Sequence, residues 1–261
     1  MGEGERNGTP AQSNAVPKGF ELRDDAVFRS IPTKEGAYEA IRICSRLDVV
    51  AQVRNDGRDW SRLVRFKDPD GRQHEVTVPM TAFAGDGTEV RSMLLEQGLL
   101  IEPTKAARDG LTAYLLACRP TKRATQVATT GWHGSVFVLP GRPAIGPKGA
   151  EPYILRDEPE DRALSASGTL EEWRQNVGKL CSGNSRLIFG VSMAVAAALL
   201  SLTGDESAGF HLVGPSSAGK TTAIKTSASV CGGPHYICQW RQTSNALEAT
   251  AAQHNDLPLY L

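Results

Sequence analysis

The sequence carries no excess of charge of either sign. Its 261 residues include 29 lysines and arginines and 29 aspartates and glutamates, so its formal net charge at pH 7 is zero. A neutral total excludes the global positive field that draws a protein to nucleic acid or to an anionic membrane. A local basic groove is still compatible with this composition, so nucleic-acid binding has to be judged from individual residues.

Cysteine is scarce, and its spacing excludes the usual metal frameworks. None of the five cysteines forms a C-x-x-C pair, and none is grouped with histidine at zinc-finger spacing. The first residues are polar and contain no hydrophobic signal core. An odd number of cysteines without such a signal indicates reduced thiols, so we expect a cytoplasmic protein with buried cysteines. They are Cys44, Cys118, Cys181, Cys231 and Cys238.

The sequence also has little that could cross a membrane. Its longest apolar run, 187–202, has about 16 residues, whereas a spanning helix needs about 20. The run contains alanine, serine and glycine, and Arg186 and Asp205 lie close to its two ends. These features predict a buried helix of a soluble domain and no membrane partner.

Composition shifts along the chain predict two domains. Residues 1–18 are rich in glycine, asparagine, serine, proline and charge, which predicts a disordered tail. Residues 19–141 mix strand and helix patterns, so we expect a smaller α+β accessory domain there. A stretch dense in proline, glycine and acidic residues, 142–167, predicts a linker, and residues 168–261 form the second domain.

A hairpin and two helices are the clearest local signals of the first domain. Asp68-Pro69-Asp70-Gly71 has proline at the second position and glycine at the fourth, which favours a type I turn between alternating segments. Helical spacing follows over 87–98 and 104–118. Strands are expected over 19–29, 40–54, 63–67, 74–78, 125–130 and 135–139, the last two on either side of Gly131-Trp132-His133-Gly134.

The second domain has the alternation of an α/β fold. Thr169 and Glu172 form a capping box that starts a helix ending near Leu180. Strand, loop, helix, strand, helix, strand then follow, which is typical of a parallel sheet. We therefore predict the N-terminal portion of a P-loop NTPase core with an incomplete sheet. The expected strands are 209–213, 236–240 and 257–261, and the expected helices are 220–230 and 244–254.

A glycine-rich loop joins the first of these strands to a helix. Residues 214–221 match the phosphate-loop pattern G-x-x-x-x-G-K-[ST] in full. Such a loop brings backbone amides and a helix N-terminus against phosphate oxygens. We expect Lys220 to reach the β- and γ-phosphates of ATP, Thr221 to ligate Mg²⁺ and Thr222 to contact the α-phosphate. The predicted nucleotide-binding residues are Gly214, Pro215, Ser216, Ser217, Ala218, Gly219, Lys220, Thr221 and Thr222.

No acidic residue after the loop stands where the carboxylate needed for hydrolysis is expected. Glu248 and Asp256 are the only acidic residues after Lys220. Glu248 falls in mid-helix and Asp256 precedes the last expected strand. Neither stands at the carboxyl end of an apolar strand, where the Mg²⁺-binding carboxylate belongs. No catalytic residue is therefore assigned.

Other residues allow two interpretations each. His133 is a turn residue or a base, and Trp132 and Trp173 are packed aromatics or stacking platforms. Arg241 faces phosphate or a neighbouring subunit or is plain surface, and Asn245 is a nucleotide sensor or an N-cap. A band of arginines interleaved with aspartates is a solvated face or a nucleic-acid contact. The band comprises Arg42, Arg46, Arg54, Arg58, Arg62, Arg65, Lys67 and Arg72.

Six longer motifs lie along residues 19–261. They are T-G-W-H-G (130–134), G-T-L-E-E-W (168–173), G-N-S-R-L-I-F (183–189), G-D-E-S-A-G-F-H-L-V-G-P-S-S-A-G-K-T-T (204–222), Q-W-R-Q-T-S-N-A-L-E (239–248) and H-N-D-L-P-L-Y-L (254–261). Together they resemble a family of uncharacterised primase–helicase-like proteins of phages and mobile elements. The resemblance implies an ATPase core of the helicase and AAA type, with ATP and Mg²⁺, single-stranded DNA as a partner and a homo-oligomeric ring at full length.

The same resemblance predicts a fragment. In that family the segment like L-P-L-Y-L runs into Asp-Glu, the Mg²⁺-binding acids, and here the sequence stops first. Three functions stay open: an ATP-binding module of a DNA-processing motor, a nucleotide-binding chain that does not hydrolyse, and a P-loop small-molecule kinase. The kinase would need an arginine-bearing lid and an acceptor pocket, for which the sequence has no signal.

Overall fold

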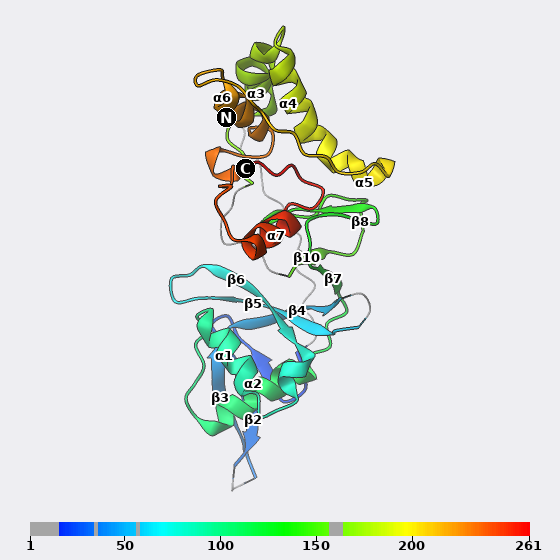
Figure 1. Cartoon of the computed structure of the whole chain (residues 1–261). Helices are drawn as coiled ribbons and strands as arrows, with labels where there is room; N and C mark the ends of the chain where they lie inside the picture. Colours follow the sequence, from blue (N-terminus) through cyan, green and yellow to red (C-terminus); the bar gives the residue numbers. More distant parts are fainter. Residues whose placement is uncertain (1–15, 34–35, 56–57, 157–163) are drawn as a thin grey trace, which may run out of the picture. The chain divides into compact units, whose positions relative to one another are not determined.

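The computed structural model describes residues 16–33, 36–55, 58–156 and 164–261 of a mixed α/β protein (Figure 1). Two compact units divide the chain, a first unit that reaches to Gln126 and a second unit that starts at Val127. This boundary falls before the segment 142–167 that was predicted as the linker. The predicted tail, 1–18, lies almost entirely outside the described residues.

Two sheets contain most of the strands. One has the antiparallel order β1-β2-β3, and the other is a mixed sheet with the order β10-β7-β4-β5-β6, in which β4 and β7 run parallel. The predicted strands 19–29 and 40–54 are each two strands, because Arg23 N bonds to Ala26 O in a turn and Arg46 separates β3 from β4. The strands are β1 (Phe20–Leu22), β2 (Ala26–Pro32), β3 (Tyr38–Ser45), β4 (Leu47–Arg54), β5 (Ser61–Lys67), β6 (Gln73–Pro79), β7 (Arg123–Val127) and β10 (Tyr153–Leu155).

The hairpin of β5 and β6 forms where the sequence predicts it. Gly71 N donates to Asp68 O at 2.9 Å, which closes the turn, and Gly71 has a φ of 79° that favours glycine. The Asp68 carboxylate accepts a further bond of 2.8 Å from Arg72 N. The turn chemistry thus sets the register of the two strands.

A large apolar core lies in the first unit. The helices α1 (Thr88–Glu96) and α2 (Lys105–Ala117), with the short 3-10 helix η1 (Met80–Phe83), lie where helical spacing predicts helices or just before them. The Thr104 side chain caps α2 by accepting from Ala107 N at 3.2 Å. Fully buried members of the core include Ile43, Leu94 and Leu111.

In the second unit, β8 (Gly131–His133) and β9 (Val136–Val138) form a small antiparallel hairpin. The strands predicted at 125–130 and 135–139 are present in part, as the end of β7 and as β9, whereas the residues between them, predicted as a connection, form a strand of their own. Trp132 N in this strand donates to Asp256 Oδ2, and Asn255 Nδ2 donates to Thr130 O beside it; no spacing in the sequence signals these bonds.

Helices make up most of the second unit. The capping box predicted at Thr169 is present, with Glu172 N bonded to Thr169 Oγ1 and Thr169 N bonded to Glu172 Oε2. The elements are α3 (Leu170–Trp173), the π-helix η2 (Arg174–Gly178), η3 (Lys179–Cys181), α4 (Ser185–Ala196), η4 (Ala197–Leu199), α5 (Leu200–Thr203), α6 (Lys220–Ala228), η5 (Pro234–Tyr236) and α7 (Ser244–Gln253).

The three strands expected in 168–261 are absent from that range as far as the structure describes it. A strand needs a neighbour that pairs with its backbone groups, and 209–213 is largely exposed, with Val213 at 83%. The other two segments share one backbone bond, from Cys238 N to Tyr260 O at 2.9 Å. The parallel sheet predicted here is therefore not formed.

The apolar run 187–202 is helical but not buried. Ala194 is the one buried residue of α4, and α6 packs against the side of α4 that carries Gly190. Ser185–Thr203 spans 19 residues and is apolar enough, by length and composition, to cross a membrane. The expectation of a buried helix is wrong.

Candidate functional site

The phosphate-loop sequence forms a tight turn at the N-terminus of α6. Ser217 and Gly219 have positive φ values of 62° and 81°, and Ala218 between them has a negative one. Alternating backbone signs direct successive N–H groups toward one point and make a concave anion site. Positive φ is unfavourable for serine, so the loop holds Ser217 against a steric preference.

Lys220 is fixed over this loop by bonds to the main chain. Its Nζ donates to Gly214 O at 2.8 Å and to Pro215 O at 2.7 Å. An ammonium group has three N–H donors, so one is left for a phosphate oxygen. The ammonium charge therefore lies against the loop that precedes the N-terminus of α6.

Thr221 and Thr222 follow in the first turn of α6, and both are exposed. Mg²⁺ takes hard oxygen ligands and keeps several waters, so an exposed hydroxyl beside the phosphate site fits its chemistry. All nine residues predicted to bind nucleotide are thus brought together in one loop and one helix turn.

The far end of α6 is anchored by polar contacts that sequence reasoning missed. Ser227, buried at 3% exposure, donates to Gly190 O on α4 at 2.5 Å and shares a bond of 2.6 Å with Tyr260 Oη. A Cβ on Gly190 would lie 3.2 Å from Ser227 Cβ, so this glycine allows the close approach of α4 and α6. Burial raises the pKa of the Tyr260 hydroxyl, which keeps it protonated. No linear pattern joins these residues.

The two candidate acids differ in their contacts and in their exposure. Asp256 uses one carboxylate oxygen to accept from Trp132 N at 2.8 Å and from Asn255 Nδ2 at 3.2 Å. Glu248 is exposed on α7. Within the described ranges, no three or more His, Cys, Asp or Glu side chains are grouped so as to hold a metal ion.

The tryptophans and the histidine named as candidates are packed into the second unit. Trp132 Nε1 donates to Ala198 O at 2.7 Å, and Trp173 Nε1 donates to Ser229 Oγ at 2.9 Å. His133 Nε2 bonds to a main-chain carbonyl four residues earlier, at 2.9 Å. These contacts favour the structural interpretation of all three side chains.

The candidates near α7 lie at or just before the N-terminal end of that helix. Thr243 caps α7 by accepting from Ala246 N at 3.3 Å, so the interpretation of Asn245 as an N-cap is wrong. Asn245 and Arg241 are both exposed, as is Trp240 at 72%. A role for Arg241 toward phosphate or a neighbouring subunit stays a prediction.

Three members of the arginine band of the first unit form ion pairs within the described residues. Exposed ion pairs along the strands favour the interpretation as a solvated face. Arg62 differs, because it is 6% exposed and its buried Nε has no partner in the described structure. Burial and the nearby Arg119 lower its pKa. The ion pairs are Arg42–Glu102 (3.0 Å), Arg46–Asp48 (3.0 Å) and Arg65–Glu75 (2.7 Å).

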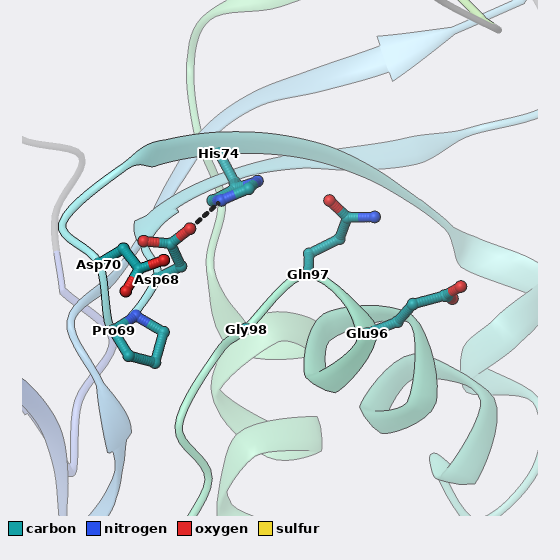
Figure 2. A pocket seen from close by; sticks show the side chains of 7 residues that line it. All are labelled: Asp68, Pro69, Asp70, His74, Glu96, Gln97 and Gly98. Carbon is teal, nitrogen blue, oxygen red and sulfur yellow. Dashed lines mark hydrogen bonds and ion pairs between the residues drawn. The ribbon is translucent and has the colours of Figure 1, made fainter. Parts of the chain in front are cut away.

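The first unit also has a hollow beside the hairpin turn, with a volume of about 330 Å³ (Figure 2). His74 points across it to Asp68, with 2.9 Å between Nε2 and Oδ2, and this contact lowers the pKa of the Asp68 carboxyl. The other Asp68 oxygen is bonded to Arg72 N, so both oxygens serve the turn. The hollow is thus explained by the hairpin. Its lining is Asp68, Pro69, Asp70, His74, Glu96, Gln97 and Gly98.

Comparison with known proteins places this architecture in a family. A family model described as "Domain of unknown function (DUF927)" matches residues 20–261. No curated protein matches the chain. The match spans both units, including the phosphate loop, but its description carries no activity.

Proposed function

The chain belongs to the DUF927 family, and from that premise we propose that it binds ATP with Mg²⁺ at residues 214–222. The observation that carries the proposal is the placement of Lys220, whose ammonium is bonded to two loop carbonyls above a turn of alternating φ. Loop amides and the α6 N-terminus would hold the phosphates, and Lys220 would neutralise the terminal ones. Thr221 would supply a hydroxyl to Mg²⁺.

The wider role that we propose is that of an ATP-binding module in a DNA-processing motor, helicase-like and belonging to a mobile element. It rests on the resemblance of the six motifs, and it includes single-stranded DNA and a homo-oligomeric ring as partners. The expected compartment is the cytoplasm. Because a fold supports many activities, this part of the proposal needs a functional test of its own.

The second candidate is nucleotide binding without hydrolysis. It is favoured by the acids after the loop, because Asp256 is engaged by Trp132 and Asn255 while Glu248 stands exposed on α7. Turnover requires a carboxylate that orients Mg²⁺ or water. A chain of this kind would bind ATP·Mg and release it unchanged.

The test measures ATP binding and hydrolysis side by side. Lys220→Ala should weaken ATP·Mg binding by about a hundredfold or more, since a charge-assisted phosphate contact is lost. Lys225→Ala is the matched control, because Lys225 is an exposed lysine of the same helix without a bond to the loop. Equal affinities of the two variants would contradict the proposed site.

Hydrolysis separates the two candidates. A motor should release phosphate faster with single-stranded DNA than without it, and the gain should fall as salt rises. Lys220-dependent binding with no turnover in either condition would favour the non-hydrolysing candidate. Turnover that ignores DNA at every salt concentration would count against the DNA-processing role.

A further inference from the structure

Residues 130–132, which lie far from the phosphate loop in the sequence, form hydrogen bonds with residues 255–256. The segment that follows residue 256 contacts α6 through Tyr260. Thr130 Oγ1 lies 2.9 Å from Asn255 O, and Asn255 Nδ2 returns a bond of 2.9 Å to Thr130 O. Trp132 N donates to Asp256 Oδ2 at 2.8 Å. Thr130 is 1% exposed, so its bonds are shielded from water. We call Thr130, Gly131, Trp132, Asn255 and Asp256 the clamp.

The clamp is closed so tightly that only glycine fits at its centre. A Cβ on Gly131 would lie 2.7 Å from Asp256 Cβ and 2.8 Å from Asn255 Nδ2, and it would overlap the Asp256 carboxylate. Gly131 has a φ of 94°, and Asp256 itself has a φ of 56°. Both residues therefore have positive φ angles, and the contacts between the two segments of the chain maintain them.

From the clamp, a short segment leads to the phosphate-loop helix. Pro258 O accepts from Tyr236 Oη at 2.8 Å, and two residues later Tyr260 Oη bonds to Ser227 Oγ on α6. Ser227 stands seven residues after Lys220, about 10 Å along the helix. The position of α6 is thus tied through Tyr260 to the clamp.

We propose that Thr130, Gly131 and Trp132 are positioning residues for the nucleotide site. By fixing Asn255 and Asp256 they set the place of Tyr260, and Tyr260 seats the helix whose first turn carries Lys220. The inference rests on the proposed ATP-binding function. It also gives Asp256 a structural role, since its carboxylate accepts the bond from Trp132 N.

The test compares two glycines of the β8–β9 hairpin, Gly131 at the start of β8 and Gly134 in the hairpin turn. Gly131→Ala forces the clamp apart, whereas Gly134→Ala, with a φ of 63° and nothing within 4 Å of its added Cβ, carries a similar backbone strain without a clash. Binding of a fluorescent ATP analogue with Mg²⁺ and amide exchange of α6 are measured on the whole chain. Exchange of the first unit reports whether each variant is folded.

Gly131→Ala should raise the Kd for the analogue about tenfold and speed exchange across α6. Gly134→Ala should stay within about twofold of the wild type on both counts. Equal behaviour of the two variants, or faster exchange confined to the turn and to 253–261, would overturn the inference.

If the wild-type chain binds no analogue, that result contradicts both the proposed ATP-binding function and the role of the clamp in nucleotide binding. Faster α6 exchange in Gly131→Ala would even then support the link between clamp and helix, because that measurement uses no nucleotide. The two failures are therefore distinguishable.

A second pair covers the case in which Gly131→Ala does not fold. Thr130→Val removes the buried hydroxyl while nearly keeping the side-chain volume, and Thr130→Ser keeps the hydroxyl. We expect Thr130→Val to weaken analogue binding several-fold, whereas Thr130→Ser should keep the affinity of the wild type. A loss of affinity that is the same in both variants would show that packing, and not the clamp bond, matters.

Discussion

The two units hold their elements together by different means. The first unit has one apolar core that runs from Val27 to Cys118, whereas the second has a small cluster of Val127, Val136, Val138 and Leu155. The second unit relies instead on directed bonds from polar groups, such as those of Thr130 and Ser227. Its α4 leaves apolar side chains in the open, with Ile188 47%, Phe189 44% and Val195 54% exposed.

The two kinds of contact contribute differently to the stability of a fold and to the placement of its residues. Burial of apolar area is non-directional, so a core stabilises a fold without defining each atom. A buried hydrogen bond fails when its partners shift, so it fixes geometry more strictly. A unit that has to place a phosphate loop gains from the second kind of contact. The predictions below follow from this contrast.

Thiol reactivity should separate the units most widely. Cys44 is fully buried, and burial raises its pKa to about 12, while Cys238 of the second unit is half-buried. A pKa of about 12 in place of about 9 lowers the thiolate fraction near neutrality about a thousandfold. Cys44 should therefore resist alkylation long after Cys238 has reacted, until the pH approaches its pKa. Mass spectrometry measures the two alkylation rates. Comparable rates for Cys44 and Cys238 would show that the core of the first unit opens readily.

Core truncation should be the next largest effect. Leu111 is fully buried in α2, so Leu111→Ala should lower the free energy of unfolding of the first unit by about 2–5 kcal/mol. Leu199→Ala in the second unit removes a side chain that is 50% exposed and should cost under about 0.5 kcal/mol. Urea unfolding followed by circular dichroism measures both. A large cost at Leu199 would mean that its helix is covered in solution.

Helix caps should give smaller, more local effects. Thr104→Ala and Thr169→Ala each remove an N-cap bond worth about 1 kcal/mol. In α2 the loss should lower the stability of the whole first unit, because α2 is part of its core. In α3 it should appear mainly as faster amide exchange of that helix. The Thr→Ser variants should retain both caps, and a global loss from Thr169→Ala would contradict the contrast.

The smallest effect concerns backbone strain. The two non-glycine residues with positive φ in the described ranges, Ser217 and Asp256, both belong to the second unit. Ser217→Gly relieves the strain in the folded state but gives the unfolded chain more conformational freedom. Because these effects oppose each other, the free energy of unfolding should change by less than about 1 kcal/mol. Thermal unfolding measures this change. A marked destabilisation would mean that the Ser217 side chain does more than tolerate the turn.

Local signals in the sequence predicted the local structure well. The turn at Asp68–Gly71 and the capping box at Thr169 involve residues a few positions apart, and both are present. The phosphate-loop motif could be recognised for the same reason, since its pattern is contiguous, and its nucleotide-binding role stays a prediction.

Contacts between distant segments were beyond the sequence. Whether 257–261 becomes a strand depends on backbone partners, and apolar content alone cannot supply them. The joining of Thr130 to Asn255 spans 125 residues without any shared spacing. The exposure of α4 likewise depends on which neighbours cover it, because apolar composition predicts burial only when a partner is present.

The way in which Lys220 is held has an electrostatic consequence. Its two partners, Gly214 O and Pro215 O, are carbonyl dipoles and carry no net charge, and no described carboxylate pairs with it. A carboxylate would have aimed the ammonium equally well, but it would also have cancelled its field. Carbonyls orient the group and leave the whole unit charge directed outward. The loop thus presents an aligned cation whose attraction for a polyanion is undiminished by its own support.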